Sequence, residues 1–189
     1  MNSEGAHHQF DLGKFIESFR RLKEQGWVRS ERRGPTGIGQ TLEVHLGLKE
    51  NNIALPDLGD VELKAHRIGS TSMLTLFTFN RKAWKMDPLE AIHKYGTKDS
   101  NGRLGMYFTM SRTPNSTGLF LHLDDYTASV RHISGQLIAE WCLDDLADQF
   151  MKKIPALILV SAQSEVRGDD EWFKFERAQL MWNTSRDIL

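Results

Sequence analysis

At 189 residues, with 40% hydrophobic and 26% charged side chains, the chain suits one globular domain with a real core and is not disordered. A formal net charge of −1 lacks the large positive excess that general nucleic-acid binders carry. The single cysteine excludes an intramolecular disulfide framework and suits a reducing cytosol. The start of the chain has no basic region followed by an apolar stretch, so we expect no signal peptide, no membrane span and a cytoplasmic location.

The first predicted element is an amphipathic helix over residues 10–24, which Gly26 ends. The side chains expected to face inward are Phe15, Ile16, Phe19 and Leu22. A second helix is predicted from about residue 39 to residue 49, with Leu42 and Leu46 on its buried side.

A glycine-bearing loop, residues 34–39, leads into this second helix, and Thr36 or Gly37 is expected near its cap. A helix N-terminus with flexible glycines lets backbone N–H groups approach a phosphate closely. Glu43, one to two turns into the helix, is placed to lean over the next strand as a further carboxylate. The alternative is that Glu43 is an ordinary solvated helix residue.

The most informative stretch is residues 61–66, where apolar and polar side chains alternate with the period of a half-buried strand. Glu62, Lys64 and His66 therefore share one face. The preceding segment has turn composition, so Asp57 can fold back beside Glu62.

Two carboxylates and an ammonium are what a magnesium-dependent phosphodiesterase site requires. Mg²⁺ prefers oxygen ligands and usually takes one or two carboxylates together with water and substrate phosphate. Asp57 and Glu62 would supply the carboxylates, and Lys64 would orient the attacking water and offset charge in the transition state. The alternative is an amphipathic edge strand whose Glu62 and Lys64 merely face solvent.

The rest of the chain predicts further strands and helices in an α/β order, without internal repeats. The expected strands are residues 73–79 (a central strand), a meander of 106–111, 118–123 and 128–133, then 156–161 and 171–177 before a short final helix. The expected helices are residues 87–94, with a proline in the first turn, and 143–153. Cys142 is expected to be a small buried hydrophobe. We predict a single α/β domain on a mixed central sheet, with a helical part at 1–50, a catalytic sheet core at 51–165 and the start of a C-terminal part at 166–189.

Two segments carry most of the positive charge. Residues 14–33 and residues 81–112 each hold seven basic side chains against three acidic ones. Basic segments on both sides of an acidic metal site would neutralise the phosphates of a duplex, although solvated helix faces would give similar counts.

Several collinear motifs resemble the MvaI/BcnI type II restriction endonucleases, in the MutH-like branch of the PD-(D/E)xK nucleases. They lie at residues 34–43, 56–57, 60–66, 74–78, 95–102 and 157–164. The resemblance implies that Asp57 and Glu62 bind metal, that Lys64 is the catalytic lysine and that Glu43 is an accessory acid. It implies Mg²⁺ as cofactor, with Mn²⁺ as a substitute. His66 is similar to a family histidine near the cleaved strand, or is an ordinary surface histidine.

The resemblance also implies a bacterial or archaeal enzyme, acting as a monomer on double-stranded DNA, with a companion DNA methyltransferase in the same system. The residues expected to contact DNA are His66, Gly37, Gly39, Thr41, Arg32, Arg33, Lys98, Arg103, Arg112 and Asn115. The loops at 98–103 and 112–116 would read bases, contact phosphate only, or be plain surface loops.

In one respect the sequence departs from the family pattern. Relatives continue beyond the point that matches Leu189 with a basic region that helps to contact the recognition sequence, so we expect weaker discrimination of the target site. Two other functions stay open: a MutH-like nicking endonuclease of mismatch repair, and a DNA-binding fragment without competent cleavage. The motifs at residues 37–39 and 95–99 favour the restriction branch.

Overall fold

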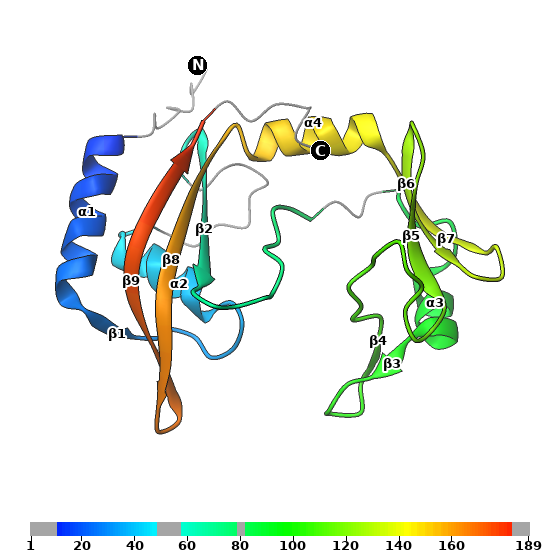
Figure 1. Ribbon diagram of the computed structural model, residues 1–189, viewed down its shortest axis with the longest axis horizontal. Helices are drawn as coiled ribbons and strands as arrows, with labels where there is room; N and C mark the ends of the chain where they lie inside the picture. The colour runs from blue at the N-terminus through cyan, green and yellow to red at the C-terminus, as the bar shows by residue number, and fades with distance from the viewer. Residues whose placement is uncertain (1–10, 49–57, 79–81, 183–189) are drawn as a thin grey trace, which may run out of the picture. The chain divides into compact units, whose positions relative to one another are not determined.

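The computed structural model describes residues 11–48, 58–78 and 82–182 (Figure 1). The chain forms two compact units. Unit 1 comprises residues 1–77 and 150–189, and unit 2 comprises residues 78–149. The single domain that the sequence patterns predicted stays a prediction.

The sheet of unit 1 has four strands in the order β1-β9-β8-β2 (Figure 1). They are β1 (Trp27–Arg29), β9 (Asp170–Met181), β8 (Ala156–Arg167) and β2 (Val61–Arg67). β1 and β8 each pair antiparallel with β9, whereas β2 pairs parallel with β8. This mixed sheet confirms the predicted α/β class, and within the described part of the chain β2 lies at its edge. β9, which falls in the predicted C-terminal part, lies inside this sheet.

The helices α1 (Leu12–Gln25) and α2 (Gly37–His45) share the main core of unit 1 with the strands. α1 begins after Asp11, whose carboxylate caps the first turn, and ends before Gly26, whose φ of 72° favours glycine. The buried apolar residues of this core include Phe15, Phe19, Leu22, Ile38, Leu42, Val61, Leu63, Ile158, Val160, Phe173 and Phe175. Ile16 was expected in the core, but this was wrong, because it is 47% exposed.

A second, smaller core lies on the other face of the sheet. It is formed by Phe150 in the last turn of α4 (Leu143–Lys153), by Ile154, and by Leu157 of β8. The partly buried residues around it are Leu76, Phe77, Met151 and Met181. Because side chains alternate along a strand and Glu62 pairs with Leu157, Glu62 points to this face as well. The bounds of α4 match the predicted helix.

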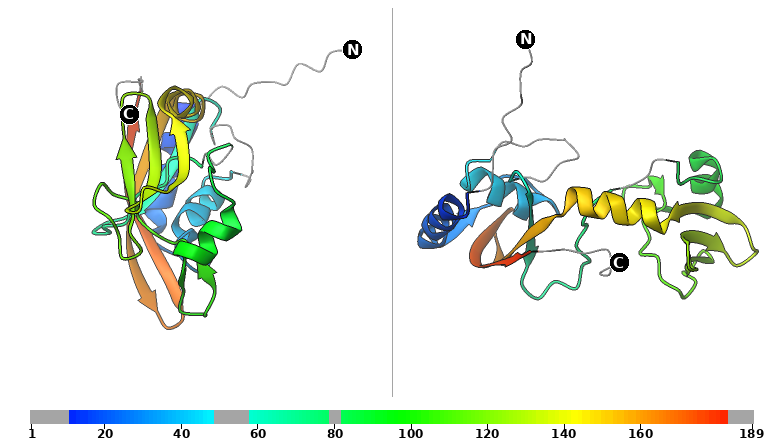
Figure 2. Two further views of the ribbon diagram at one scale, coloured as in Figure 1. Left: turned by 90° about the vertical axis from the view of Figure 1, so that its right-hand side faces the viewer. Right: turned by 90° about the horizontal axis from the view of Figure 1, so that it is seen from above.

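The described part of unit 2 contains a three-stranded antiparallel sheet, one complete helix, a short hairpin and residues 143–149 of α4 (Figures 1 and 2). The sheet strands are β5 (Leu119–Leu123), β6 (Thr127–His132) and β7 (Leu137–Cys142), the helix is α3 (Pro88–Tyr95), and the hairpin strands are β3 (Thr97–Lys98) and β4 (Leu104–Gly105). The carboxylate of Asp87 accepts from the N–H groups of Leu89 and Glu90 at 2.9 and 3.0 Å, which confirms the predicted helix start. Ala91 and Tyr95 of α3 pack against the sheet strands.

Some predicted strands are wrong. Residues 73–78 form no strand, because their apolar side chains Leu76 and Phe77 pack into the second core of unit 1 rather than into a sheet; residue 79 lies outside the described residues. Residues 106–110 also form no strand, and the third strand of the meander is β7 instead. Cys142, at the end of β7, is exposed rather than buried.

Other boundaries differ by a few residues. The second helix ends at His45 rather than at residue 49. β8 continues to Arg167 and β9 to Met181, because the two strands pair with each other as one long hairpin. The predicted final helix falls mainly on residues 183–189, outside the described residues. No helix in the described ranges has the length and apolar character needed to cross a membrane.

Candidate active site

The centre of the candidate site is the carboxylate of Glu62 on β2. Glu62 is only 1% exposed and lies between two lysines. The Nζ of Lys64, on the same strand face, is 2.5 Å from its Oε1, and the Nζ of Lys153 at the end of α4 is 2.9 Å from its Oε2. Oε2 makes no hydrogen bond with the described residues, and its contact with Lys153 is an ion pair.

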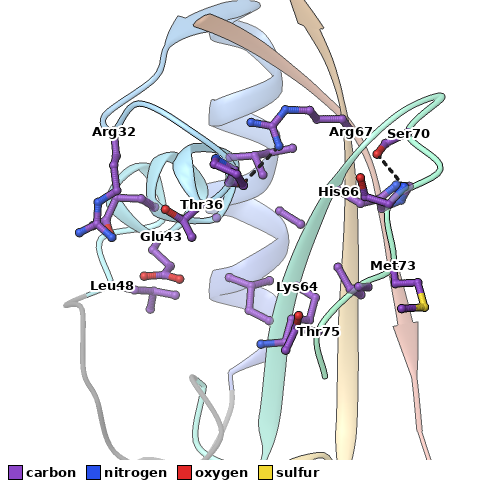
Figure 3. Close-up of a pocket in the computed structure, with 18 residues that line it drawn as sticks. Arg32, Thr36, Glu43, Leu48, Lys64, His66, Arg67, Ser70, Met73 and Thr75 are labelled. Carbon is purple, nitrogen blue, oxygen red and sulfur yellow. Dashed lines mark hydrogen bonds between the residues drawn. The ribbon is translucent and has the colours of Figure 1, made fainter. Parts of the chain in front are cut away.

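A pocket of about 510 Å³ opens beside β2 and brings together several predicted site residues (Figure 3). Lys64 and His66 project from β2 and Glu43 projects from α2 (Figure 3). Glu43 is half-buried. Glu62 is buried behind this pocket rather than lining it, so Lys64 connects the buried carboxylate with the open space. Asp57, the other predicted metal ligand, lies outside the described residues.

The loop that leads into α2 is held by buried polar contacts. The hydroxyl of Thr41, which is fully buried, donates to the carbonyl of Gly37 at 2.7 Å and accepts from the N–H of Glu31 at 3.0 Å. Gly37 is buried as well. These two predicted DNA contacts therefore have no exposed surface here, and they fix the shape of the loop instead. Thr36 is the N-cap residue, as expected, but its side chain makes no capping hydrogen bond.

Gly37 has no room for a side chain. A Cβ there would lie 2.3 Å from the carbonyl oxygen of Arg32 and 2.6 Å from Oγ of Ser30. We expect Gly37→Ala to lower the free energy of unfolding by about 1–3 kcal/mol, because backbone must shift to admit the methyl group. Urea denaturation followed by circular dichroism measures this.

Gly39, two residues further along the same helix, is the matched control. A Cβ at Gly39 would meet nothing within 4 Å. Gly39→Ala should therefore leave stability unchanged or raise it by up to about 1 kcal/mol, since alanine favours a helix over glycine. Equal losses in Gly37→Ala and Gly39→Ala would contradict the close approach at Gly37.

Arg67, at the end of β2, is a site-supporting residue that the sequence patterns did not reveal. Its Nε and Nη2 donate to the two carboxylate oxygens of Glu171 on β9 at 2.7 and 2.9 Å. Its Nη1 donates to the carbonyl of Pro35 at 3.2 Å, and its guanidinium lies over the ring of Phe173. Arg67 thus ties the loop before α2 to β2 and β9.

Lys153 was also missed, because only part of the information that places it near Glu62 is visible in the sequence. The predicted helix ends at residue 153, shortly before the strand that pairs in parallel with the one carrying Glu62. A parallel pairing of those two strands would have brought the end of the helix close to Glu62. The sequence patterns alone did not reveal that pairing.

The predicted DNA-contacting residues are distributed over both units. In unit 1, Arg32 and Arg33 are exposed in the loop before α2, and His66 and Gly39 line the pocket with Arg32. In unit 2, the exposed side chains are Lys98, Arg103 and Arg112.

Asp99 organises the loop that carries Lys98 and Arg103. The backbone N–H of Arg103 donates to the Asp99 carboxylate at 2.9 Å, and its Nε does so at 3.0 Å. The backbone hydrogen bond from Arg103 is the main reason that the pKa of Asp99 lies below its ordinary value. The Asp99 carboxylate therefore holds both the backbone and the side chain of Arg103 in this loop.

Asn115 supports the neighbouring loop rather than presenting a free amide. Its Oδ1 accepts from the N–H and hydroxyl of Thr117 and from the N–H of Leu119, each at 3.0 Å. Its Nδ2 is buried and makes no hydrogen bond with the described residues. Base reading from this loop would fall to Arg112, which is exposed.

The chemistry of the donor set fits a hard divalent cation at Glu62. Within the described residues there is no group of three or more His, Cys, Asp or Glu side chains that could enclose a metal ion. Mg²⁺ does not require such a group, because it usually takes one or two carboxylates and fills its other positions with water and phosphate oxygens. The buried Oε2 of Glu62, which lacks a hydrogen bond, is an oxygen suited to that role.

A mixed sheet with a buried glutamate and a lysine two residues later on its edge strand is compatible with a metal-dependent nuclease. The sequence model of the MvaI/BcnI restriction endonuclease family matches residues 16–188, and the chain belongs to this family. This confirms the resemblance seen in the motifs. No curated protein matches the chain significantly.

A solved structure agrees with this assignment. The chain is similar to the restriction endonuclease MvaI in its complex with cognate DNA substrate, with a TM-score of 0.76 and 25% identity over 95% of this chain and 78% of that one. MvaI in the absence of DNA matches at 25% identity with a TM-score of 0.42, over 99% of this chain and 78% of that one.

Proposed function

We propose that this protein is a Mg²⁺-dependent type II restriction endonuclease that hydrolyses phosphodiester bonds in double-stranded DNA at a short specific site. The observation that carries the proposal is the buried Glu62 carboxylate paired with Lys64, whose side chain opens into the pocket beside β2. Membership of a restriction endonuclease family supports the reaction class. The DNA bound to MvaI in the similar structure supports duplex DNA as the substrate.

Each site residue has a role in the proposal. Glu62 and Asp57 hold the metal ion, with Glu43 as an accessory acid. A bound Mg²⁺ would polarise a phosphoryl oxygen, lower the pKa of a bound water and stabilise the leaving oxygen. Lys64 orients the attacking water and offsets negative charge on the phosphate, because its ammonium is fixed by Glu62 and its side chain, which is 24% exposed, lines the pocket.

The proposed DNA contacts combine direct and indirect roles. Arg32, Arg33 and His66 would contact the duplex from unit 1. Lys98, Arg103 and Arg112 would contact it from unit 2. Asn115, Gly37 and Thr41 would act by holding their loops, because their polar atoms are engaged or buried. Host DNA carries the same short sites. We therefore also propose a companion DNA methyltransferase in the same system.

Digestion of a defined plasmid tests this function. With Mg²⁺ the protein should convert supercoiled plasmid into a fixed set of linear fragments, and EDTA should stop the reaction. Nicked circles alone would identify a nicking enzyme instead. Binding of DNA without any cleavage in Mg²⁺ or Mn²⁺ would contradict the proposed nuclease and indicate a DNA-binding protein without competent cleavage.

A further inference from the structure

The last turn of α4 places a second ammonium against the buried carboxylate of Glu62. Phe150 and Ile154 are both buried in the second core of unit 1 and fix this part of the chain. Lys153 lies between them in sequence, and only 14% of its side chain is exposed, whereas Lys152 is exposed. A lysine at a helix C-terminus ordinarily interacts with the helix dipole in solvent. Lys153 instead turns inward onto Oε2 of Glu62.

The two lysines contact different oxygens of Glu62. Lys64 is 2.5 Å from Oε1, and Lys153 is 2.9 Å from Oε2. Oε2 is thus the oxygen that the Lys153 ammonium occupies, and a cation that binds this oxygen must compete with Lys153.

The two ammonium groups around Glu62 oppose the binding of a further cation. Among the described residues, one carboxylate between two ammonium groups leaves a local excess of one positive charge. A divalent cation on Oε2 would have to displace the Lys153 ammonium or stand beside it. Like charges a few ångströms apart in a partly buried site repel strongly, because the surrounding dielectric is low.

We propose that Lys153 is a positioning residue that acts through Glu62. In the metal-free protein its ammonium neutralises the buried carboxylate and keeps Oε2 oriented, and it yields this oxygen when a divalent cation binds. This inference rests on the proposed function, because it assumes that Glu62 is a metal ligand. It predicts that Lys153 weakens metal binding while it stabilises the metal-free site.

The test measures Mn²⁺ binding to the full chain by electron paramagnetic resonance, without DNA. Lys153→Met keeps the length of the side chain and removes the charge. We expect it to bind Mn²⁺ about tenfold tighter than the wild type, since the competing charge is gone. Lys153→Arg keeps the charge and should bind Mn²⁺ within about threefold of the wild type. If Lys153 acted through packing alone, the Mn²⁺ affinities of Lys153→Met and Lys153→Arg would not differ according to the charge of the side chain.

Lys152→Met is the matched control, because it removes the same charge from the neighbouring, exposed position. It should change Mn²⁺ affinity by less than about twofold, as expected for a screened surface charge. If Lys153→Met does not fold, Lys153→Gln tests the same loss of charge with a polar side chain, and thermal melts without metal identify the folded variants.

Glu62→Gln separates the two proposals. If the wild type shows no Mn²⁺ binding that Glu62→Gln removes, both the metal role of Glu62 and this inference fail. If Glu62-dependent binding is present and the folded neutral variants of Lys153 bind Mn²⁺ no tighter than the wild type, the inference on Lys153 alone is overturned.

Discussion

Glu62→Gln should lower the rate of DNA cleavage by about a thousandfold or more while leaving the fold intact. The amide keeps the shape of the carboxylate but loses the charge that pairs with Lys64 and that we propose holds the metal ion. Each tenfold loss of rate corresponds to about 1.4 kcal/mol of transition-state stabilisation, so the expected loss is about 4 kcal/mol. Single-turnover cleavage of a plasmid at saturating Mg²⁺ measures it.

Glu24→Gln is the control for this substitution. Glu24 is an exposed residue of α1, and its replacement changes the net charge by the same amount. It should leave the cleavage rate within about twofold of the wild type, as most surface substitutions do. Full activity of folded Glu62→Gln would remove Glu62 from the active site.

Arg67→Met should clearly lower the free energy of unfolding. Methionine removes the bidentate pair with Glu171 and the hydrogen bond to the carbonyl of Pro35, and it leaves Glu171 without its cation. Arg67 and Glu171 are 25% and 22% exposed, so part of the loss is recovered by solvent, and we expect about 2–3 kcal/mol. Guanidinium denaturation measures the change.

Arg29→Met breaks a comparable ion pair at the surface of the same sheet. Arg29 donates to Asp170 at 2.9 Å, but its side chain is 64% exposed. An exposed pair of this kind contributes little, so this variant should unfold close to the wild-type denaturant midpoint. If Arg29→Met and Arg67→Met lose equal stability, the Arg67–Glu171 pair stabilises the site no more than an exposed ion pair does.

The periodicity of apolar residues correctly predicted the helices and strands that bury one face and expose the other. β2 and α4 appear close to the predicted bounds, because alternation in β2 and the helical repeat in α4 each follow one apolar face. Residues 73–78 failed for the opposite reason. Their apolar content suggested a strand, but Leu76 and Phe77 gain their burial from the core under α4 without any pairing partner.

Long-range partners in the candidate site were harder to predict. The shared face of Glu62, Lys64 and His66 follows from spacing along one strand; the structure places all three on β2 and brings Lys64 into contact with Glu62. The contacts of Lys153 with Glu62 and of Arg67 with Glu171 join segments that lie far apart in sequence, and only the strand order brings them together. Asp57 stays a prediction.

The most direct test of the central claim compares DNA binding and DNA cleavage by the wild type and Glu62→Gln on one plasmid fragment. Binding is measured with Ca²⁺ and cleavage with Mg²⁺, at enzyme concentrations that saturate the fragment. We expect both proteins to bind the duplex and only the wild type to cut it at fixed positions. EDTA should abolish this cutting. Cleavage by the wild type that persists in EDTA, or equal cleavage by Glu62→Gln, would contradict a metal-dependent site built on Glu62.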